Sequence, residues 1–195
     1  MYKIAKPLSF KATLGDIQNL GDIKSYQLVS SEPLKSKWPN NVTIPISPID
    51  PNYPDYGEEL TDYMVAESSL VVISENLKNE LSKIIDDNKL EFLPVKILKR
   101  DGSEVNSSFF LLNVLNQSEI INEEETIAQR NLLKPGQLSL VSKLVLDQKK
   151  PDENSLIFRT HLLPYLIFMK DELITQINTK FPDSIEIVEE QSYRS

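Results

Sequence analysis

The sequence predicts an α+β fold: a mixed sheet with two related strand-helix-strand modules and a long proline-rich N-terminal loop. The first module is indicated by residues 70–98, where an apolar, mostly β-branched run precedes helical and then strand-like patterning. The second is indicated by the same order of patterns at residues 166–188. The loop is indicated by six prolines between residues 32 and 62, because proline lacks the amide hydrogen that a helix or a sheet would use.

These patterns divide the chain into three parts. We expect one α+β domain over residues 1–195, composed of N-terminal strands and an irregular proline-rich segment (1–62), a first module (63–122) and a second module (123–195). Length and composition agree with this division, since 40% hydrophobic and 26% charged residues are ordinary for a globular chain with a substantial core.

The first 30 residues contain two short runs of strand-like character, at residues 2–4 and 26–29. Glycine-aspartate pairs at residues 15–16 and 21–22 separate them and are typical of turns. We therefore expect an N-terminal edge strand, which the second run could extend to a hairpin.

The proline-rich segment that follows also concentrates aromatic and acidic side chains. Loops longer than about 12–15 residues are uncommon in compact domains and are usually functional or disordered. Two interpretations are open. The rings could pin the segment onto the core, or the segment could be a recognition surface, since Trp and Tyr are frequent in interface hot spots and carboxylates steer basic partners. The side chains concerned are Trp38, Tyr53, Asp55, Tyr56, Glu58 and Glu59.

The first module carries the clearest local signals. Ser74 directly follows the apolar run Leu70–Ile73 and stands where a helix N-cap is expected. Leu77, Leu81, Ile84 and Ile85 then recur at helical spacing. Further strands are expected at residues 90–98 and 109–112, with a turn at Arg100–Gly102 between them.

The second module begins with a less regular stretch. After Glu123-Glu124-Glu125, residues Ile127, Asn131 and Lys134 share one helical face, although this periodicity is weak, and Pro135-Gly136 ends it. Strands are expected at residues 138–146 and 156–159.

The end of the chain repeats the start of the first module. Residues 166–169 predict a strand, Lys170-Asp171-Glu172 a helix start, and residues 185–188 a second strand. Leu173, Ile177 and Phe181 lie four residues apart, as on one face of a helix. Residues 73–77 align with 169–173, which is why we predict two related modules.

Charge and composition limit the class of partner. A net charge of −8 and a pI near 4.8 disfavour direct binding of nucleic acid and favour a basic partner. The absence of cysteine excludes disulfides and thiolate zinc sites. Residues 1–7 lack the apolar core of a signal peptide, and no apolar run approaches the roughly 20 residues of a spanning helix. We expect a cytoplasmic protein that does not contact membranes.

Motifs for catalysis are missing from the sequence. It contains no P-loop, G-x-G-x-x-G, H-E-x-x-H or G-x-S-x-G, and His161, the only histidine, has no second histidine or cysteine to work with. We expect no catalytic residue, no metal site and no cofactor. A carboxylate-based enzyme is the least favoured hypothesis, because it requires two carboxylates with raised pKa values in one cleft. The candidates would be Asp50, Asp55, Glu58, Glu123 and Glu125.

Several segments together resemble a known bacterial family. The segments are Leu70–Lys78, Glu91–Val95 and Phe109–Asn116, with Lys143–Asp147 and Ile157–Arg159 in the second half. This pattern is similar to the immunity proteins of polymorphic toxin systems, specifically immunity family eleven, and covers roughly residues 62–190.

The resemblance implies binding and not catalysis. A protein of this family would occlude a cognate toxin domain, often a nuclease, in the cytoplasm of the producing cell. The acidic charge suits a basic nuclease as partner. From composition we expect toxin contacts at the acidic and aromatic loop and at a second acidic patch: Trp38, Tyr53, Asp55, Tyr56, Glu58, Glu59, Glu123, Glu124 and Glu125. The alternative is a non-catalytic structural or adaptor protein that assembles with itself or with a secretion component.

Overall fold

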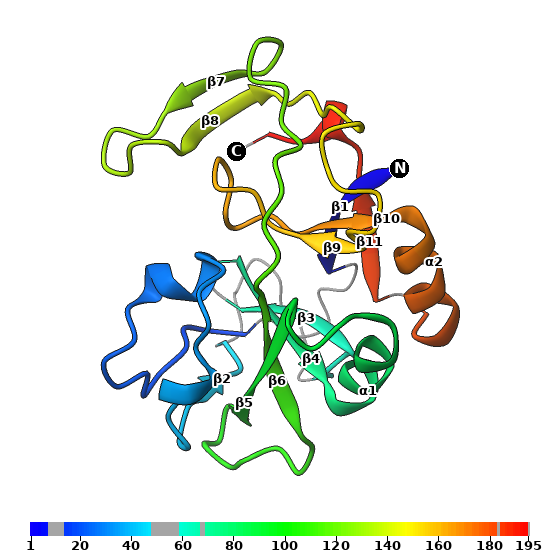
Figure 1. Cartoon of the computed structure of the whole chain (residues 1–195). Coiled ribbons are helices and arrows are strands. Elements are labelled where there is room, and N and C mark those ends of the chain that lie inside the picture. The colour runs from blue at the N-terminus through cyan, green and yellow to red at the C-terminus, as the bar shows by residue number, and fades with distance from the viewer. Residues whose placement is uncertain (8–13, 48–58, 67–68, 183, 195) are drawn as a thin grey trace.

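Three β-sheets and two α-helices form an α+β architecture in which strands predominate (Figure 1). The computed structural model describes residues 1–7, 14–47, 59–66, 69–182 and 184–194. All statements below concern these residues.

The largest sheet has five strands in the order β2-β5-β6-β4-β3. Its strands are β2 (Thr43–Pro45), β3 (Tyr63–Ala66), β4 (Leu70–Ser74), β5 (Leu90–Leu98) and β6 (Phe109–Val114). β2 is parallel to β5 and all other pairs are antiparallel, so the sheet is mixed, as predicted. The expected strands at residues 90–98 and 109–112 are confirmed within it.

The second sheet has four antiparallel strands in the order β11-β1-β10-β9. They are β1 (Tyr2–Pro7), β9 (Ile157–Phe158), β10 (Phe168–Lys170) and β11 (Ile185–Val188). The N-terminal strand is therefore an inner strand, and its prediction as an edge strand was wrong. The error arises because β1 pairs with strands more than 150 residues away, which local patterning cannot detect.

Each helix connects two strands of one sheet. α1 (Glu75–Ile84) runs from β4 to β5, and α2 (Asp171–Lys180) runs from β10 to β11. In both cases a third strand lies between the connected two: β6 in the first sheet and β1 in the second. In the chain, β6 follows the strand-helix-strand unit β4-α1-β5, whereas β1 precedes the unit β10-α2-β11. Duplication of the unit therefore stays a prediction.

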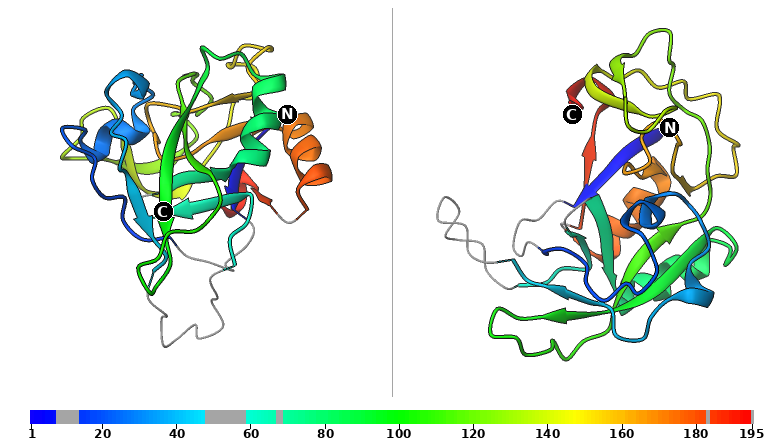
Figure 2. Two further views of the ribbon diagram at one scale, coloured as in Figure 1. Left: turned by 90° about the horizontal axis from the view of Figure 1, so that it is seen from below. Right: turned by 90° about the vertical axis from the view of Figure 1, so that its left-hand side faces the viewer.

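The start of α1 follows from its sequence. Ser74 is the N-cap, and its hydroxyl accepts a hydrogen bond from the amide of Leu77 at 3.2 Å while donating one to the Asp62 carboxylate. Leu77 and Leu81 are fully buried at the predicted helical spacing. α1 and α2 lie side by side (Figures 1 and 2), so both contribute to one core.

The hydrophobic core has three parts, separated by the two larger sheets. One lies between the sheets and includes both helices, with Leu77, Ile73 and Ile174 among its buried residues. The second covers the other face of the five-stranded sheet with the N-terminal segment, through residues such as Leu34 and Ile44. The third packs the four-stranded sheet against the sheet of β7 (Ile127–Arg130) and β8 (Leu138–Lys143).

Two further expectations differ from the structure. Residues 25–29 form a 3₁₀-helix, η1 (Ser25–Val29), so they do not form a hairpin with β1. Residues 127–130 form β7 and not a helix, because pairing with β8 outweighs a weak helical periodicity. In the proline-rich segment the structure describes η2 (Lys35–Lys37) and β2, and residues 48–58 lie outside the described residues. The chain's last element is η4 (Glu190–Ser192).

Candidate functional site

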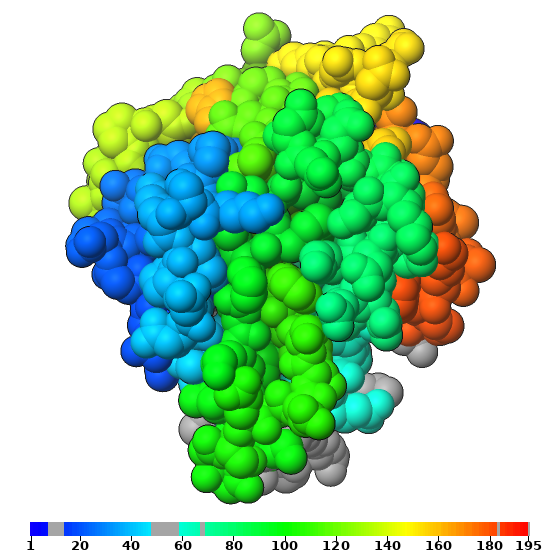
Figure 3. All heavy atoms as spheres, turned by 60° about the horizontal axis from the view of Figure 1, so that its bottom comes forward, coloured from blue at the N-terminus to red at the C-terminus, as the bar shows by residue number. Residues whose placement is uncertain are grey.

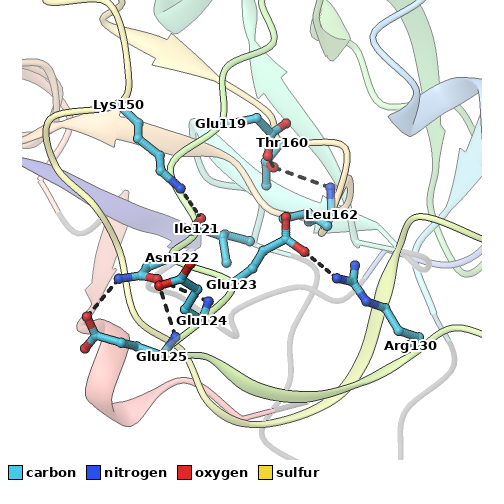
Figure 4. Close-up of polar contacts among 10 residues, drawn as sticks. All are labelled: Glu119, Ile121, Asn122, Glu123, Glu124, Glu125, Arg130, Lys150, Thr160 and Leu162. Atoms are coloured by element: carbon cyan, nitrogen blue, oxygen red, sulfur yellow. Dashed lines mark hydrogen bonds and ion pairs between the residues drawn. The ribbon is translucent and has the colours of Figure 1, made fainter.

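A rigid acidic turn precedes β7 (Figure 4). Asn122 organises it: its side-chain oxygen accepts hydrogen bonds from the amides of Glu124 at 3.2 Å and Glu125 at 3.4 Å, and its side-chain nitrogen donates to Glu125 Oε1 at 2.9 Å. Glu123 forms an ion pair with Arg130 of β7. All three glutamates are exposed, so the turn presents negative charge in a fixed geometry.

A second carboxylate contact lies close to this turn. Glu119 accepts hydrogen bonds from Thr160 Oγ1 at 2.9 Å and from the amide of His161 at 3.4 Å, and its Oε1 lies 2.5 Å from His161 Nδ1. Both side chains of the Glu119–His161 pair are about half exposed. The pair ties the chain before the acidic turn to the loop after β9, and the only histidine is thereby engaged at the surface.

The β7–β8 hairpin that follows the acidic turn exposes four large apolar side chains. Leu132 and Leu133 at the tip are 94% and 93% exposed, and Ile127 and Leu140 on the strands are 60% and 62% exposed. Leu140 is also held at φ +47°, a backbone conformation that costs a leucine roughly 1–2 kcal/mol. Several exposed apolar side chains on one element are typical of interaction sites.

A groove of about 680 Å³ lies over β5 and β6, between η2 and α1, as Figure 3 shows. Lys78 Nζ lies 4.4 Å from the centroid of the Phe110 ring on its wall. The Glu91 carboxylate in the groove accepts hydrogen bonds from the amides of Leu34 at 2.7 Å and Lys35 at 3.2 Å. This carboxylate therefore holds the N-terminal segment on the sheet.

The structure places the predicted contact residues in different regions. Trp38 is half-buried, donates from Nε1 to the Pro94 carbonyl at 2.8 Å and packs on the core beneath the N-terminal segment, as the pinning interpretation expects. Glu59 is exposed near β3. Glu123 to Glu125 lie beside β7, at the opposite end of the molecule from β2 and η2 (Figure 1).

The remaining predicted contacts are Tyr53, Asp55, Tyr56 and Glu58, which lie outside the described residues, as does Asp50. Of the carboxylates that an enzyme would need to bring together, Glu123 and Glu125 lie on one exposed turn. Within the described ranges, no three His, Cys, Asp or Glu side chains are grouped so that they could hold a metal ion.

Sequence reasoning missed the exposed leucines of the hairpin. Leu132 and Leu133 lie within the stretch whose weak periodicity indicated a helix, and their apolar character gives no reason to place them in solvent. The available signal was their setting, because Asn131 before them and Pro135-Gly136 after them are typical of a tight turn.

One buried ionisable pair lies between the two larger sheets, away from these surfaces. Arg159 is 1% exposed, and burial lowers the pKa of its guanidinium to about 10. Its Nη1 donates to the Pro164 carbonyl at 2.5 Å, while Nε and Nη2 have no hydrogen-bond partner among the described residues. Burial also raises the pKa of the Tyr63 phenol well above its usual range. These groups belong to the interior and affect stability.

An acidic turn beside an exposed apolar hairpin is typical of interaction proteins. The comparison with known families specifies it further: the chain is a member of the immunity protein family Imm11, whose profile matches residues 14–187. The resemblance inferred from the sequence is thus confirmed. The match also extends to residue 14, into the N-terminal third that the resemblance did not cover.

Membership of an immunity family implies a toxin as partner in general. Comparison with curated proteins gives no match. Neither helix in the described part of the chain has the length and apolar character needed to cross a membrane.

Proposed function

We propose that this protein binds a cognate toxin domain of a polymorphic toxin system and neutralises it in the cytoplasm of the producing cell, without catalysing a reaction. The observation that carries the proposal is the family match over residues 14–187, which covers both helices and all of the described strands except β1 and the last residue of β11. Neutralisation by occlusion requires only a stable surface complementary to the toxin.

The charge of the chain favours a basic toxin, such as a nuclease. At −8 the protein attracts a positively charged partner over distances of about 10 Å at moderate salt and raises the association rate. We place contacts at Glu123, Glu124 and Glu125, whose fixed turn displays three carboxylates without further ordering. The aromatic and acidic residues of the N-terminal segment, Trp38, Tyr53, Asp55, Tyr56, Glu58 and Glu59, are proposed as a second contact region.

Growth rescue is the direct test. The chain would be expressed beside the toxin-like C-terminal domain that its neighbouring gene encodes, and survival would be scored together with co-purification of the two proteins. Survival with a 1:1 complex is the expected result. Cell death in the presence of folded, well-expressed chain would overturn the proposal for that toxin.

A salt series on the purified pair tests the electrostatic part. If the toxin is basic and contacts the acidic turn, the association rate falls steeply as ionic strength rises, while the dissociation rate changes little. An association rate that is insensitive to salt would contradict the acidic turn as a contact.

The exposed leucines of the hairpin favour a second candidate, a self-assembling adaptor. Such a protein would show a mass that increases with concentration. Light scattering between micromolar and millimolar protein distinguishes it from a monomeric immunity protein.

A further inference from the structure

Two buried polar side chains between the larger sheets carry hydrogen-bond donors that no described residue uses. Arg159 is 1% exposed, and its Nε and Nη2 atoms have no hydrogen-bond partner among the described residues. Tyr63 is 0% exposed, and within the same ranges its hydroxyl has no partner either. Buried polar groups in folded proteins are nearly always paired, so these two side chains require an explanation.

The backbone directs both side chains into the same layer of the molecule. Ile157 of β9 packs in the core between the sheets, and Phe158 packs in the core beneath β7 and β8. Arg159 continues this extended chain with a bridge to Gln117, and because side chains alternate along a strand it points to the same side as Ile157. Tyr63 begins β3 of the facing sheet and packs in the core between the sheets (Figure 1). The pair therefore spans the two larger sheets.

The electrostatics of the pair indicate an uncompensated positive charge. Burial lowers the pKa of Arg159 to about 10, and the neighbouring Tyr63 acts in the opposite direction. Burial raises the pKa of Tyr63 well above its usual range, and the Arg159 charge opposes this rise. No carboxylate among the described residues contributes to the pKa of Arg159. A desolvated cation of this kind is costly unless an opposite charge accompanies it.

An anion satisfies this pair better than a water molecule does. The free guanidinium nitrogens carry only donors, and the phenol can donate as well. A water molecule would accept these hydrogen bonds, but it brings hydrogens of its own and no charge. A halide ion accepts from every donor and neutralises the guanidinium. The core around Tyr63 is otherwise apolar, which favours a small ion over an oxyanion whose further oxygens would be unpaired.

We propose that the Arg159 guanidinium and the Tyr63 hydroxyl bind one halide-sized anion, such as chloride, which bridges the four-stranded and the five-stranded sheet. This site goes beyond the proposed function, because it concerns how the two sheets are held together and not which partner the surface contacts. A cleft of about 540 Å³ between the sheets is lined by Val71 and Ile167, among others, and both also pack in the core that contains Tyr63. We expect the ion to enter from this side.

The test measures how bromide, used in place of chloride, changes the stability of the full chain. For a Kd of about 10 mM, sodium bromide at about 0.5 M should lower the unfolding constant of the wild type by about 50-fold, because the ion binds only to the folded chain. Arg159→Met should respond by less than about threefold. Arg130→Met is the matched control: it removes the same charge from the surface, where Arg130 pairs with Glu123, and should respond like the wild type.

Two further measurements examine the site itself. Tyr63→Phe keeps the cation and removes one donor, so bromide should lower its unfolding constant by only about tenfold. Each protein is compared with itself in the absence of bromide, so differences in starting stability cancel. Crystals of the wild type grown in sodium bromide locate the ion without any variant: anomalous scattering at the bromine absorption edge should give a peak between Arg159 and the Tyr63 hydroxyl.

Any of three results overturns the proposal. An equal response of the wild type and Arg159→Met would show that bromide acts through general screening of the charge of the chain. An equal response of the wild type and Tyr63→Phe would show that the hydroxyl does not bind the ion. Density between the two side chains without anomalous signal would show that water satisfies the donors.

Discussion

Replacing Arg159 with methionine tests the energetic cost of a buried charge that has no counter-charge among the described residues. The guanidinium is 1% exposed between the two larger sheets and donates one hydrogen bond, from Nη1 to the Pro164 carbonyl. Methionine has a similar length, no charge and no donor, so the variant keeps most of the packing while it removes the desolvated cation.

The magnitude follows from the pKa. Burial lowers the pKa of Arg159 from 12.5 to about 10. At roughly 1.4 kcal/mol per pKa unit, this corresponds to about 3 kcal/mol of unfavourable free energy in the folded state. The full amount applies at neutral pH, because the guanidinium is then protonated in both the folded and the unfolded state. Losing the donor to the Pro164 carbonyl costs about 1–3 kcal/mol. We therefore expect Arg159→Met to be neutral or more stable than the wild type by up to about 2 kcal/mol.

Urea unfolding at pH 7 measures this change. The fluorescence of Trp38, the only tryptophan, reports on the N-terminal segment, and far-UV circular dichroism reports on the whole chain. Coincidence of the two transitions checks two-state behaviour. Arg159→Ala is the control, since it removes the same charge and the same donor but leaves a cavity, and it should be less stable than Arg159→Met by about 2–5 kcal/mol.

Loss of more than about 2 kcal/mol in the methionine variant would refute the reasoning. It would mean that the guanidinium gains more from its surroundings than it loses by leaving water. Equal stability of the methionine and alanine variants would refute the packing part of the argument, because the site would then have collapsed around the smaller side chain.

Two other changes test local features. Ser74→Ala removes the N-cap of α1, whose hydroxyl binds the Leu77 amide and Asp62, and should lower the free energy of unfolding by about 1 kcal/mol in thermal melts. The control is Ser82→Ala on the exposed side of the same helix, which should change this free energy by less than about 0.5 kcal/mol. Tyr63→Phe tests the buried phenol: its pKa is raised in the folded state, so its contribution to stability is complete below pH 10 and is lost as pH rises above that. The wild type should therefore lose more stability than the variant between pH 8 and pH 11; parallel losses would show that the phenol ionises equally in both states.

Most of the helices and strands of the two larger sheets were predictable because their signals are local. Leu70–Ser74, the helix beginning at Glu75 and the strand at Leu90–Leu98 combine an apolar run, a cap and a change of period within 30 residues. The order of strands was not predictable in the same way. β1 lies between β10 and β11, at the other end of the chain, and no pattern within residues 2–7 identifies those partners.

The candidate site was predictable in part. Glu123 to Glu125 are exposed, as expected for a run of charge, but Asn122, whose side chain gives the turn its shape, was not singled out. Hydrophobic patterning assigns leucines to the interior. It fails at Leu132 and Leu133 because a short turn fixed by Asn131 leaves no core within reach of their side chains.

The position of the hairpin has an energetic consequence for binding. A two-stranded sheet is marginally stable on its own in water. Here its inner face contributes Leu138 and Val141 to a core shared with the four-stranded sheet, and this burial holds the strands in place. The entropy cost of ordering the hairpin is therefore met when the chain folds, and a partner that contacted its outer face would not incur it again. Buried and exposed positions of the hairpin are thus different side chains, so the exposed leucines can be substituted while the core beneath them is retained.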